Sequence, residues 1–288
     1  MADMTNYLER ALTHVESLPP LSNVFHKILE LTEGDDYSRD DLIRCVSLDQ
    51  AIAAKVLQTI NSAYFGMGQR VTSLEVAVGL LGDKQVRDLA IMCTTSGLMG
   101  VPIRGYGIQA NQFWLHSITT AFGARLIADR CSSWHREEAF AAGLLLDIGK
   151  VVLDRIVEEP DKETLQKIAE EILPEHHTKE MDLYGFDHCA IGFFLARKWN
   201  FSKELTESIA FHHYSDLDVD HKEMVQVISF ADMLSHLILA NEPEPDFAAL
   251  FKNEENIPFG LSLQDINDIY IQLQAEVSDS EKFLGINQ

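Results

Sequence analysis

The sequence predicts an all-α protein, a multi-helix bundle with an N-terminal helical lobe. Three observations lead to this prediction. Apolar residues recur in many segments at the three- and four-residue spacing of an amphipathic helix. Several of these segments follow a hydroxyl side chain with an acid or amide three positions later, the pattern of a helix start. No segment alternates convincingly between apolar and polar residues, so we expect little or no sheet.

The first clearly amphipathic helix is expected directly after Pro19-Pro20. Its single, mostly apolar stripe consists of Leu21, Val24, Phe25, Ile28, Leu29 and Thr32. Proline is favoured at the start of a helix, where its missing N–H costs no hydrogen bond. The segment 21–32 therefore predicts a helix that buries one face.

Four capping boxes predict the starts of further helices. They are Ser38–Asp41, Ser47–Gln50, Thr72–Glu75 and Ser262–Asp265. In such a box the hydroxyl accepts a hydrogen bond from the third helical N–H, and the acid or amide reaches back to the cap. Helices of about 8 to 20 residues are expected between the breaks in the sequence.

A stretch rich in glycine, "GVPIRGYG" at 100–107, predicts a boundary within the chain. We expect an N-terminal helical lobe over residues 1–100 and a larger helical lobe, with the C-terminal helices, over residues 101–288. Nine of the eleven histidines lie after this break. A site built from histidine is therefore expected in the larger lobe.

The charge balance restricts the classes of partner. The chain has 23 Lys and Arg against 45 Asp and Glu, a formal net charge of −22. This charge should repel polyphosphate backbones and anionic lipid surfaces, so we expect neither a nucleic-acid partner nor a membrane partner.

The remaining composition predicts a soluble, cytoplasmic protein. No apolar run approaches the roughly 20 residues that cross a bilayer. The N-terminus "MADMTNYLER" lacks the basic start and the apolar middle of a secretory signal. The four cysteines form no C-x-x-C pair and are expected to be small core residues.

Two carboxylates fall on apolar helix faces, where an ionised group is costly unless something pairs with it. Asp147 follows three leucines in "GLLLDIGK" and has Lys150 as its one local cation. Asp232 continues a helical stripe that contains Val225 and Ile228. We expect both acids to be largely buried and to share a partner.

Histidines at other positions could supply that partner. His116 lies on a strongly apolar helix, and His188 begins another. His212 and His213 end a third helix, and because neighbouring helical residues point about 100° apart, we expect one of the two to face a common pocket. Imidazole and carboxylate are the usual ligands of Zn²⁺, Fe and Mn²⁺. Two interpretations stay open: a metal site assembled from several helices, or separate histidine and carboxylate hydrogen bonds and ion pairs.

The order of these motifs resembles a known family. The succession "SLPPLSNVFHKILELTE", "NSAYFG", "AFAAGLLLDIGKVVL", "YGFDHCAIGFFLARKWNF" and "IAFHHYSD" is similar to the HDOD family, the HD-related output domain of bacterial signalling proteins. The similarity covers about residues 17 to 216. The wider HD superfamily consists of metal-dependent phosphohydrolases with an H…HD…D signature.

The resemblance implies an HD-like bundle and a set of candidate ligands for a divalent metal, with Fe, Mn, Zn and Mg as the candidates. These residues are His116, Asp147, His188, His212, His213 and Asp232. It also implies a role in signal transduction through a protein partner, and it leaves the oligomeric state open.

One departure from the family signature separates two functions. Leu146 stands where the HDIGK form of the motif has histidine, so one metal ligand is absent. We expect a non-catalytic regulatory module with a degenerate and weakened metal site, which binds protein partners or a ligand in the HD pocket. The alternative is a metal-dependent phosphohydrolase acting on a nucleotide or a signalling phosphodiester, with Lys150 as a catalytic phosphate contact or proton donor.

Overall fold

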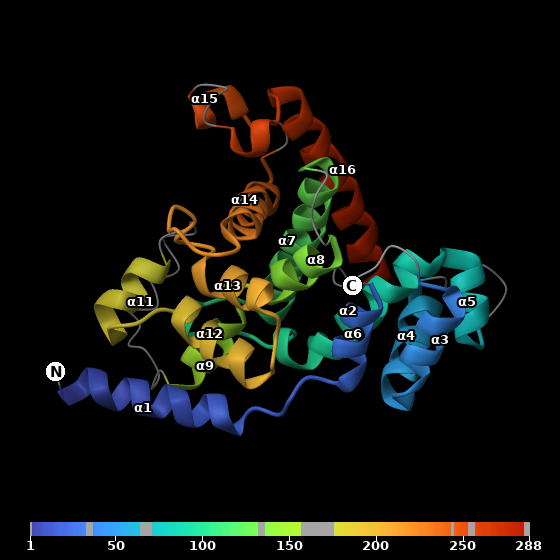
Figure 1. Ribbon diagram of the computed structural model, residues 1–288, viewed down its shortest axis with the longest axis horizontal. Helices are drawn as coiled ribbons and strands as arrows, with labels where there is room; N and C mark the ends of the chain where they lie inside the picture. Colours follow the sequence, from blue (N-terminus) through green and yellow to red (C-terminus); the bar gives the residue numbers. More distant parts are fainter. Residues whose placement is uncertain are drawn as a thin grey trace. The chain divides into compact units, whose positions relative to one another are not determined.

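A computed structural model of the chain describes residues 2–32, 37–63, 71–131, 136–156, 176–242, 245–252 and 257–284. Within these ranges the regular structure is helical, and the one extended pairing is an isolated bridge between Ile103 and Ile108. The all-α prediction is therefore confirmed (Figure 1). No helix in this part of the chain combines the length and apolar character that a membrane crossing requires.

The backbone divides into two compact units. The first comprises residues 1–20 and 98–274, and the second comprises residues 21–97 and 275–288. Boundaries of lobes at 1–100 and 101–288 stay a prediction. Helices α2 to α5 belong to the second unit and cover Asn23–Thr32, Arg39–Ser47, Gln50–Ala63 and Leu74–Leu81. Two helices, α6 (Asp83–Met99) and α16 (Leu263–Leu284), have residues in both units.

The first unit contains the remaining helices. They are α1 (Ala2–Ser17), η1 (Arg104–Tyr106), α7 (Ala110–Cys131), α8 (Arg136–Leu145), α9 (Ile148–Ile156), α11 (His176–Tyr184), α12 (His188–Lys198), α13 (Lys203–Phe211), α14 (Lys222–Leu239), α15 (Phe247–Phe251) and η3 (Pro258–Gly260).

Local side-chain chemistry sets several helix starts. The capping boxes at Ser38 and Ser262 are confirmed, since each hydroxyl accepts from the N–H three residues later, at 3.2 Å and 3.1 Å. The box expected at Thr72 is wrong by one residue, because Ser73 is the N-cap of α5.

The box expected at Ser47 is also wrong. Ser47 is still inside α3, and its hydroxyl donates to the Ile43 carbonyl at 2.7 Å. The Asp49 carboxylate accepts the first free N–H groups of α4 instead, from Ala51 at 2.9 Å and Ile52 at 3.2 Å. Asp49 directly precedes the first residue of α4, and a carboxylate at this N-cap position can accept hydrogen bonds from the N–H groups of the first turn.

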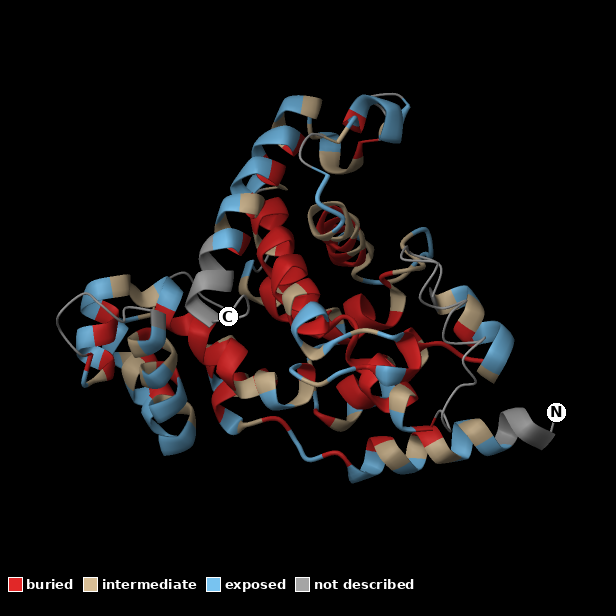
Figure 2. Cartoon of the chain, turned by 180° about the vertical axis from the view of Figure 1, so that it is seen from behind, coloured by how far each residue is buried: buried red, intermediate tan, exposed pale blue. Residues whose placement is uncertain are grey.

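Helices α7 and α8 form the centre of the first unit. Residues on every side of α7 are buried between Phe113 and Ala128, except Leu115 and Arg125, and all of α8 from Ala139 to Leu145 is buried (Figure 2). α7 packs against α8 and α14. At Gly143 the two backbones are so close that a Cβ atom would lie 2.8 Å from the Thr120 carbonyl oxygen. A helix buried on all sides needs such small residues where it crosses its neighbours.

A second close contact joins α9 to α12. A Cβ atom at Gly149 would lie 1.9 Å from the His188 carbonyl oxygen and 2.9 Å from the Gly192 nitrogen. These neighbours are backbone atoms, so no side-chain rotation can relieve the overlap. The glycine thereby lets the start of α12 approach the turn that precedes α9.

The N-terminal helix α1 packs on α9 and α12. The Lys198 ammonium, at the end of α12, donates to the carbonyls of Val15, Glu16 and Leu18 at 2.6 to 2.8 Å. These carbonyls lie at the C-terminus of α1, where they have no partner within the helix. The lysine therefore ties the two helix ends together.

We expect Gly149→Ala to destabilise the protein by about 3 kcal/mol, because two backbone segments must separate to admit one methyl group. Thermal and urea unfolding followed by circular dichroism measures the change. Gly79→Ala is the matched control, since Gly79 is also inside a helix and has open space around a Cβ atom. The control should be neutral or stabilising by up to about 1 kcal/mol. Equal stability of both variants would contradict the close approach of α9 and α12.

Candidate functional site

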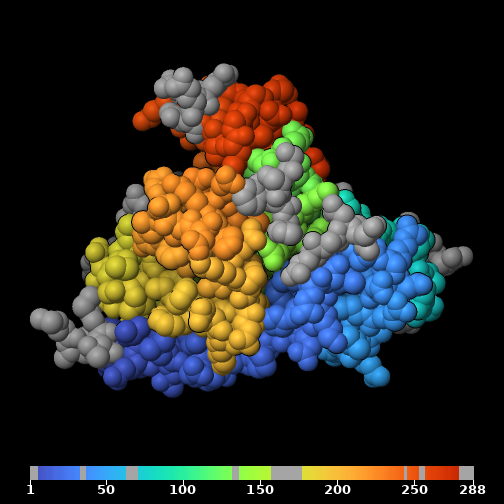
Figure 3. Space-filling view, viewed as in Figure 1, coloured from blue at the N-terminus to red at the C-terminus, as the bar shows by residue number. Residues whose placement is uncertain are grey.

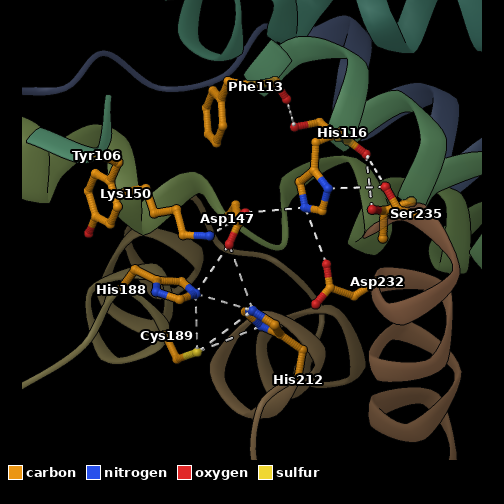
Figure 4. A network of polar contacts seen from close by, with 12 residues as sticks. Tyr106, Phe113, His116, Asp147, Lys150, His188, Cys189, His212, Asp232 and Ser235 are labelled. Atoms are coloured by element: carbon orange, nitrogen blue, oxygen red, sulfur yellow. Dashed lines mark hydrogen bonds and ion pairs between the residues drawn. The ribbon is translucent and has the colours of Figure 1, made fainter. Parts of the chain in front are cut away.

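The buried carboxylate of Asp147 is the centre of a polar network in the first unit (Figure 4). Asp147 lies in the short turn between α8 and α9, not inside a helix as the spacing predicts. Only 2% of the residue is exposed. Its Oδ2 atom accepts from the ammonium of Lys150, the one local cation, at 2.7 Å.

On one side of Asp147 lie a histidine and a second carboxylate. The His116 Nε2 atom, from α7, is 3.4 Å from Asp147 Oδ2 and 3.2 Å from Asp232 Oδ1. Asp232 is buried on α14, in line with the apolar stripe. The two acids expected to share a partner therefore share the imidazole of His116.

On the other side lie two histidines and a cysteine. His188 Nε2 is 3.2 Å from Asp147 Oδ1, and His212 Nε2 is 3.9 Å from the same oxygen. The two Nε2 atoms are 3.3 Å apart. The Cys189 sulfur is 3.7 Å from His188 Nε2 and 3.8 Å from His212 Nε2. Figure 4 shows these groups turned toward one another from α12, from the end of α13 and from the turn that carries Asp147.

The other ring nitrogen of each histidine is held by an acceptor. His212 Nδ1 lies 3.0 Å from the Ile209 carbonyl oxygen, which only accepts, so this nitrogen carries a proton. His188 Nδ1 donates to the Glu180 carboxylate at 2.7 Å. The Nε2 atom of each ring therefore faces Asp147. It carries a lone pair when the ring is neutral and a second proton when the ring is charged. Such anchoring of the far nitrogen is typical of metal-binding histidines.

Ser235 gives His116 the same kind of anchor. Its hydroxyl lies 3.0 Å from His116 Nδ1 and donates to the His116 carbonyl at 3.3 Å. The hydroxyl proton is then directed at the carbonyl, so the oxygen accepts from Nδ1. His116 Nε2 is thereby aimed at Asp147 and Asp232.

His213 and His236 border the network. His213 stacks on His177 with ring centroids 4.5 Å apart and meets the His188 ring edge to face. His236 Nε2 is 3.5 Å from Asp232 Oδ1. Ligand atoms of His188, Cys189, His212 and His213 lie within 4.8 Å of one another, and so do those of His116, Asp232 and His236.

The electrostatics of the network favour positive charge next to Asp147. Burial lowers the pKa of His116, but hydrogen bonds to Asp147 and Asp232 outweigh it and raise the pKa to about 9. Burial also lowers the pKa of Lys150, and the Asp147 charge outweighs it and raises that pKa above its usual value. Burial raises the pKa of the Cys189 thiol, and the neighbouring His212 and His188 outweigh it, so the pKa is lowered.

Asp147 Oδ1 tests whether these residues fit a cation. This oxygen is buried and accepts no hydrogen bond from the groups that the structure describes. His188 Nε2 and His212 Nε2 lie 3.2 Å and 3.9 Å from it, and the Cys189 sulfur lies 3.7 Å and 3.8 Å from those two nitrogens; imidazole and thiolate are ligands of divalent transition metals. An unsatisfied carboxylate oxygen among such donors is costly, so the donor set fits a bound cation.

The six predicted ligands differ in their relation to Asp147. His116, His188 and His212 contact its carboxylate, Asp232 reaches it through His116, and His213 lies beside His188 and His212. The assignment of metal-binding roles to these residues stays a prediction.

Sequence reasoning did not assign Cys189, Glu180, Ser235 or His236 to the site. Cys189 directly follows His188, which was the one local signal for the cysteine. His236 follows Asp232 by four residues, a spacing that places both on one helix face. Glu180 and Ser235 carried no signal, because each acts through a histidine from another helix.

Comparison with known proteins places this geometry in context. A family model described as the HDOD domain matches residues 18–215. An uncharacterised protein of Treponema pallidum (strain Nichols) is 24% identical over 231 residues. That match covers 80% of this chain and 44% of the other protein, so the chain spans less than half the length of this curated relative.

Solved structures share the fold. An HDOD domain protein of unknown function from Geobacter sulfurreducens has a TM-score of 0.71 at 24% identity, and the match covers 100% of this chain and 98% of that one. A candidate signal transduction protein from Marinobacter aquaeolei VT8 scores 0.72 at 22% identity, covering 99% and 66%. A candidate phosphohydrolase from Shewanella amazonensis SB2B scores 0.66 at 21%, covering 97% and 98%. Identities this low show a common fold.

The raised pKa of His116 predicts a pH dependence of stability in metal-free protein. Because the folded-state pKa of about 9 lies above the ordinary 6.5, the stabilisation is fully present below pH 6.5 and is lost as the pH rises through 9. We expect a loss of about 3 kcal/mol over this range. The charged groups facing the ring are Asp147, Asp232, Lys150 and His236.

Urea unfolding of chelator-treated protein measures this dependence. The measurement is repeated between pH 6 and pH 9.5 at intervals of about half a pH unit. His116→Gln is the reference, because it removes this titrating imidazole and should make the curve less steep. A wild-type curve parallel to that of His116→Gln would contradict the prediction.

Proposed function

Since the chain belongs to the HDOD family, we propose that it is a non-catalytic regulatory module of signal transduction. In this proposal it binds a protein partner, or a small ligand in its degenerate HD-type pocket, without turning over a substrate. The high negative charge favours a partner with a basic surface over nucleic acid or an anionic membrane.

The proposal rests on Leu146, and the contact between Lys150 and Asp147 is consistent with it. An aspartate that bridges two metal ions uses both of its oxygens, and a two-metal phosphohydrolase needs both ions to hold the attacking and leaving oxygens. Here the Lys150 ammonium donates a hydrogen bond to Asp147 Oδ2 at 2.7 Å. One oxygen, Oδ1, is left for a cation.

Leu146 supports the same conclusion. This side chain is fully buried and stands next to Asp147 in the turn, at the place of the motif histidine. Leucine has no lone pair to offer a metal. The turn therefore presents one ligand where the HD signature presents two.

The burial of the part of the network around Asp147, His188 and His212 also supports binding without turnover. His188 and His212 are almost completely inaccessible to solvent, as is Asp147. In the space-filling view α12, α13 and α14 form a continuous surface on one face of the first unit (Figure 3). A hydrolase needs an open metal position that a substrate oxygen and a water can reach.

The proposed ligands of a cation are drawn from the network around Asp147. They are His116, Asp147, His188, His212, His213 and Asp232. A bound divalent cation would supply fixed positive charge that neutralises the buried acids. The chain's own part is to hold the imidazoles in place through Glu180, Ser235 and the Ile209 carbonyl.

A second candidate function is a metal-dependent phosphohydrolase acting on a nucleotide or signalling phosphodiester. The observation that favours it is the presence of two groups of possible ligands, His116 with Asp232 and His236, and His188 with Cys189 and its neighbours, on the two sides of Asp147. Two ions would need these two groups. Lys150 would then be released from Asp147 to contact a phosphate.

Turnover assays distinguish the two functions. We expect wild-type protein, loaded with Mn²⁺, Fe²⁺ or Zn²⁺, to hydrolyse bis(p-nitrophenyl) phosphate and cyclic dinucleotides no faster than Asp147→Ala under the same conditions. Product release followed by absorbance and chromatography measures the rate. Wild-type turnover well above that of Asp147→Ala, in protein that elutes as a folded species, would overturn the proposed function.

Leu146→His is the complementary variant, because it restores the missing ligand. We expect it to raise the number of divalent ions bound per chain, measured by elemental analysis after gel filtration. An unchanged ion count in a folded variant would show that the leucine does not limit metal binding.

A further inference from the structure

Four possible ligand atoms surround one point beside Asp147. They are Asp147 Oδ1, His188 Nε2, Cys189 Sγ and His212 Nε2 (Figure 4). All four residues are buried, and they come from the α8–α9 turn, from the first turn of α12 and from the end of α13. The family resemblance implied the aspartate and the two histidines as metal ligands, but not the cysteine.

Four separations among these atoms lie close to those of a tetrahedral site, and the separation between Asp147 Oδ1 and His212 Nε2 is longer. With bonds of about 2.0–2.1 Å to nitrogen and oxygen and about 2.3 Å to sulfur, a regular tetrahedron places nitrogen and oxygen ligands about 3.3 Å apart and nitrogen about 3.6 Å from sulfur. The two Nε2 atoms are 3.3 Å apart, and Oδ1 is 3.2 Å and 3.9 Å from them. The sulfur is 3.7 Å and 3.8 Å from the same nitrogens.

The Nε2 atoms of the two imidazoles lie close together beside Asp147. Their Nδ1 atoms donate to Glu180 and to the Ile209 carbonyl, so whenever both rings are neutral their Nε2 atoms are unprotonated and lie 3.3 Å apart. Two lone pairs at this separation repel each other unless a proton or a cation lies between them. Asp147 Oδ1, which accepts no hydrogen bond within the described residues, faces the same point.

We infer that Cys189 is a thiolate ligand that completes a closed, zinc-type site with Asp147, His188 and His212. The site takes a borderline-soft divalent ion such as Zn²⁺ or Co²⁺ in preference to Mg²⁺, because thiolate and imidazole disfavour hard cations. Since four protein ligands leave no position for water, this site deepens the proposed non-catalytic function and rests on it.

Cobalt spectroscopy of the whole chain tests the thiolate directly. Metal-free, reduced protein is titrated with Co²⁺, and we expect a near-ultraviolet sulfur-to-cobalt charge-transfer band together with the intense visible bands of a tetrahedral ion. One equivalent of Zn²⁺ should abolish both, whereas excess Mg²⁺ should not. Cys189→Ser should lose the charge-transfer band and bind Co²⁺ at least about tenfold more weakly.

Cys93→Ser is the matched control, because Cys93 is also buried but lies in α6 of the second unit. This variant should keep the band and the affinity of the wild type. Absence of the band from the wild type, or its persistence in Cys189→Ser, overturns the inference. If the charge-transfer band is retained in Cys189→Ser and lost in Cys93→Ser, the sulfur ligand is Cys93. This result also overturns the inference.

X-ray absorption at the zinc edge of the wild type does not depend on a folded variant. We expect one sulfur at about 2.3 Å and nitrogen or oxygen ligands at about 2.0–2.1 Å. A shell of nitrogen and oxygen alone overturns the inference even where Cys189→Ser fails to fold.

The phosphodiester assay on the same preparations separates this inference from the proposed function. Turnover in protein that shows the sulfur ligand overturns the closed site and the non-catalytic function, and the thiolate assignment stands. Neither turnover nor a sulfur ligand overturns the inference, and the regulatory function stands.

Discussion

The buried charge of Asp147 is the constraint on which the first unit depends. An ionised carboxylate away from water costs several kcal/mol unless positive charge and hydrogen-bond donors compensate it. The turn between α8 and α9 is too short to carry the side chain back to the surface. The compensating groups are therefore contributed by neighbouring helices. They are the ammonium of Lys150 from α9 and the imidazoles from α7, α12 and the end of α13. The small residues Gly143 and Gly149 make this convergence possible, because they let the helix backbones approach closely.

A second layer of groups decides what the histidines can do. Glu180, Ser235 and the Ile209 carbonyl each take one ring nitrogen, and the other nitrogen is then directed at the carboxylates. Tyr106 in turn donates to Glu180 at 2.6 Å, so the anchor is itself held in place. Rings fixed in this way need little reorganisation when a proton or a cation occupies the centre.

In the proposed function, the two oxygens of the Asp147 carboxylate decide between binding a cation and hydrolysing a substrate. Oδ2 accepts a hydrogen bond from the Lys150 ammonium, and Oδ1 faces the Nε2 atoms of His188 and His212. A lysine supplies charge without coordination sites for water, whereas a second metal ion would supply both. Leu146 removes a ligand beside Asp147, whereas Lys150 is a cation that the HDIGK form of the motif also has.

The sequence by itself determined the helical class, the helix starts at Ser38 and Ser262, the burial of Asp147 and Asp232 and the family, because periodicity, caps and ordered motifs are local or successive features of the chain. It missed the turn position of Asp147 and the capping role of Asp49, where neighbouring patterns compete. Only the tertiary structure decided that Cys189 stands beside His212, that Glu180 orients His188 and that Ser235 orients His116. These contacts join different helices, and their distances follow from how the backbones pack, which no spacing along the chain records.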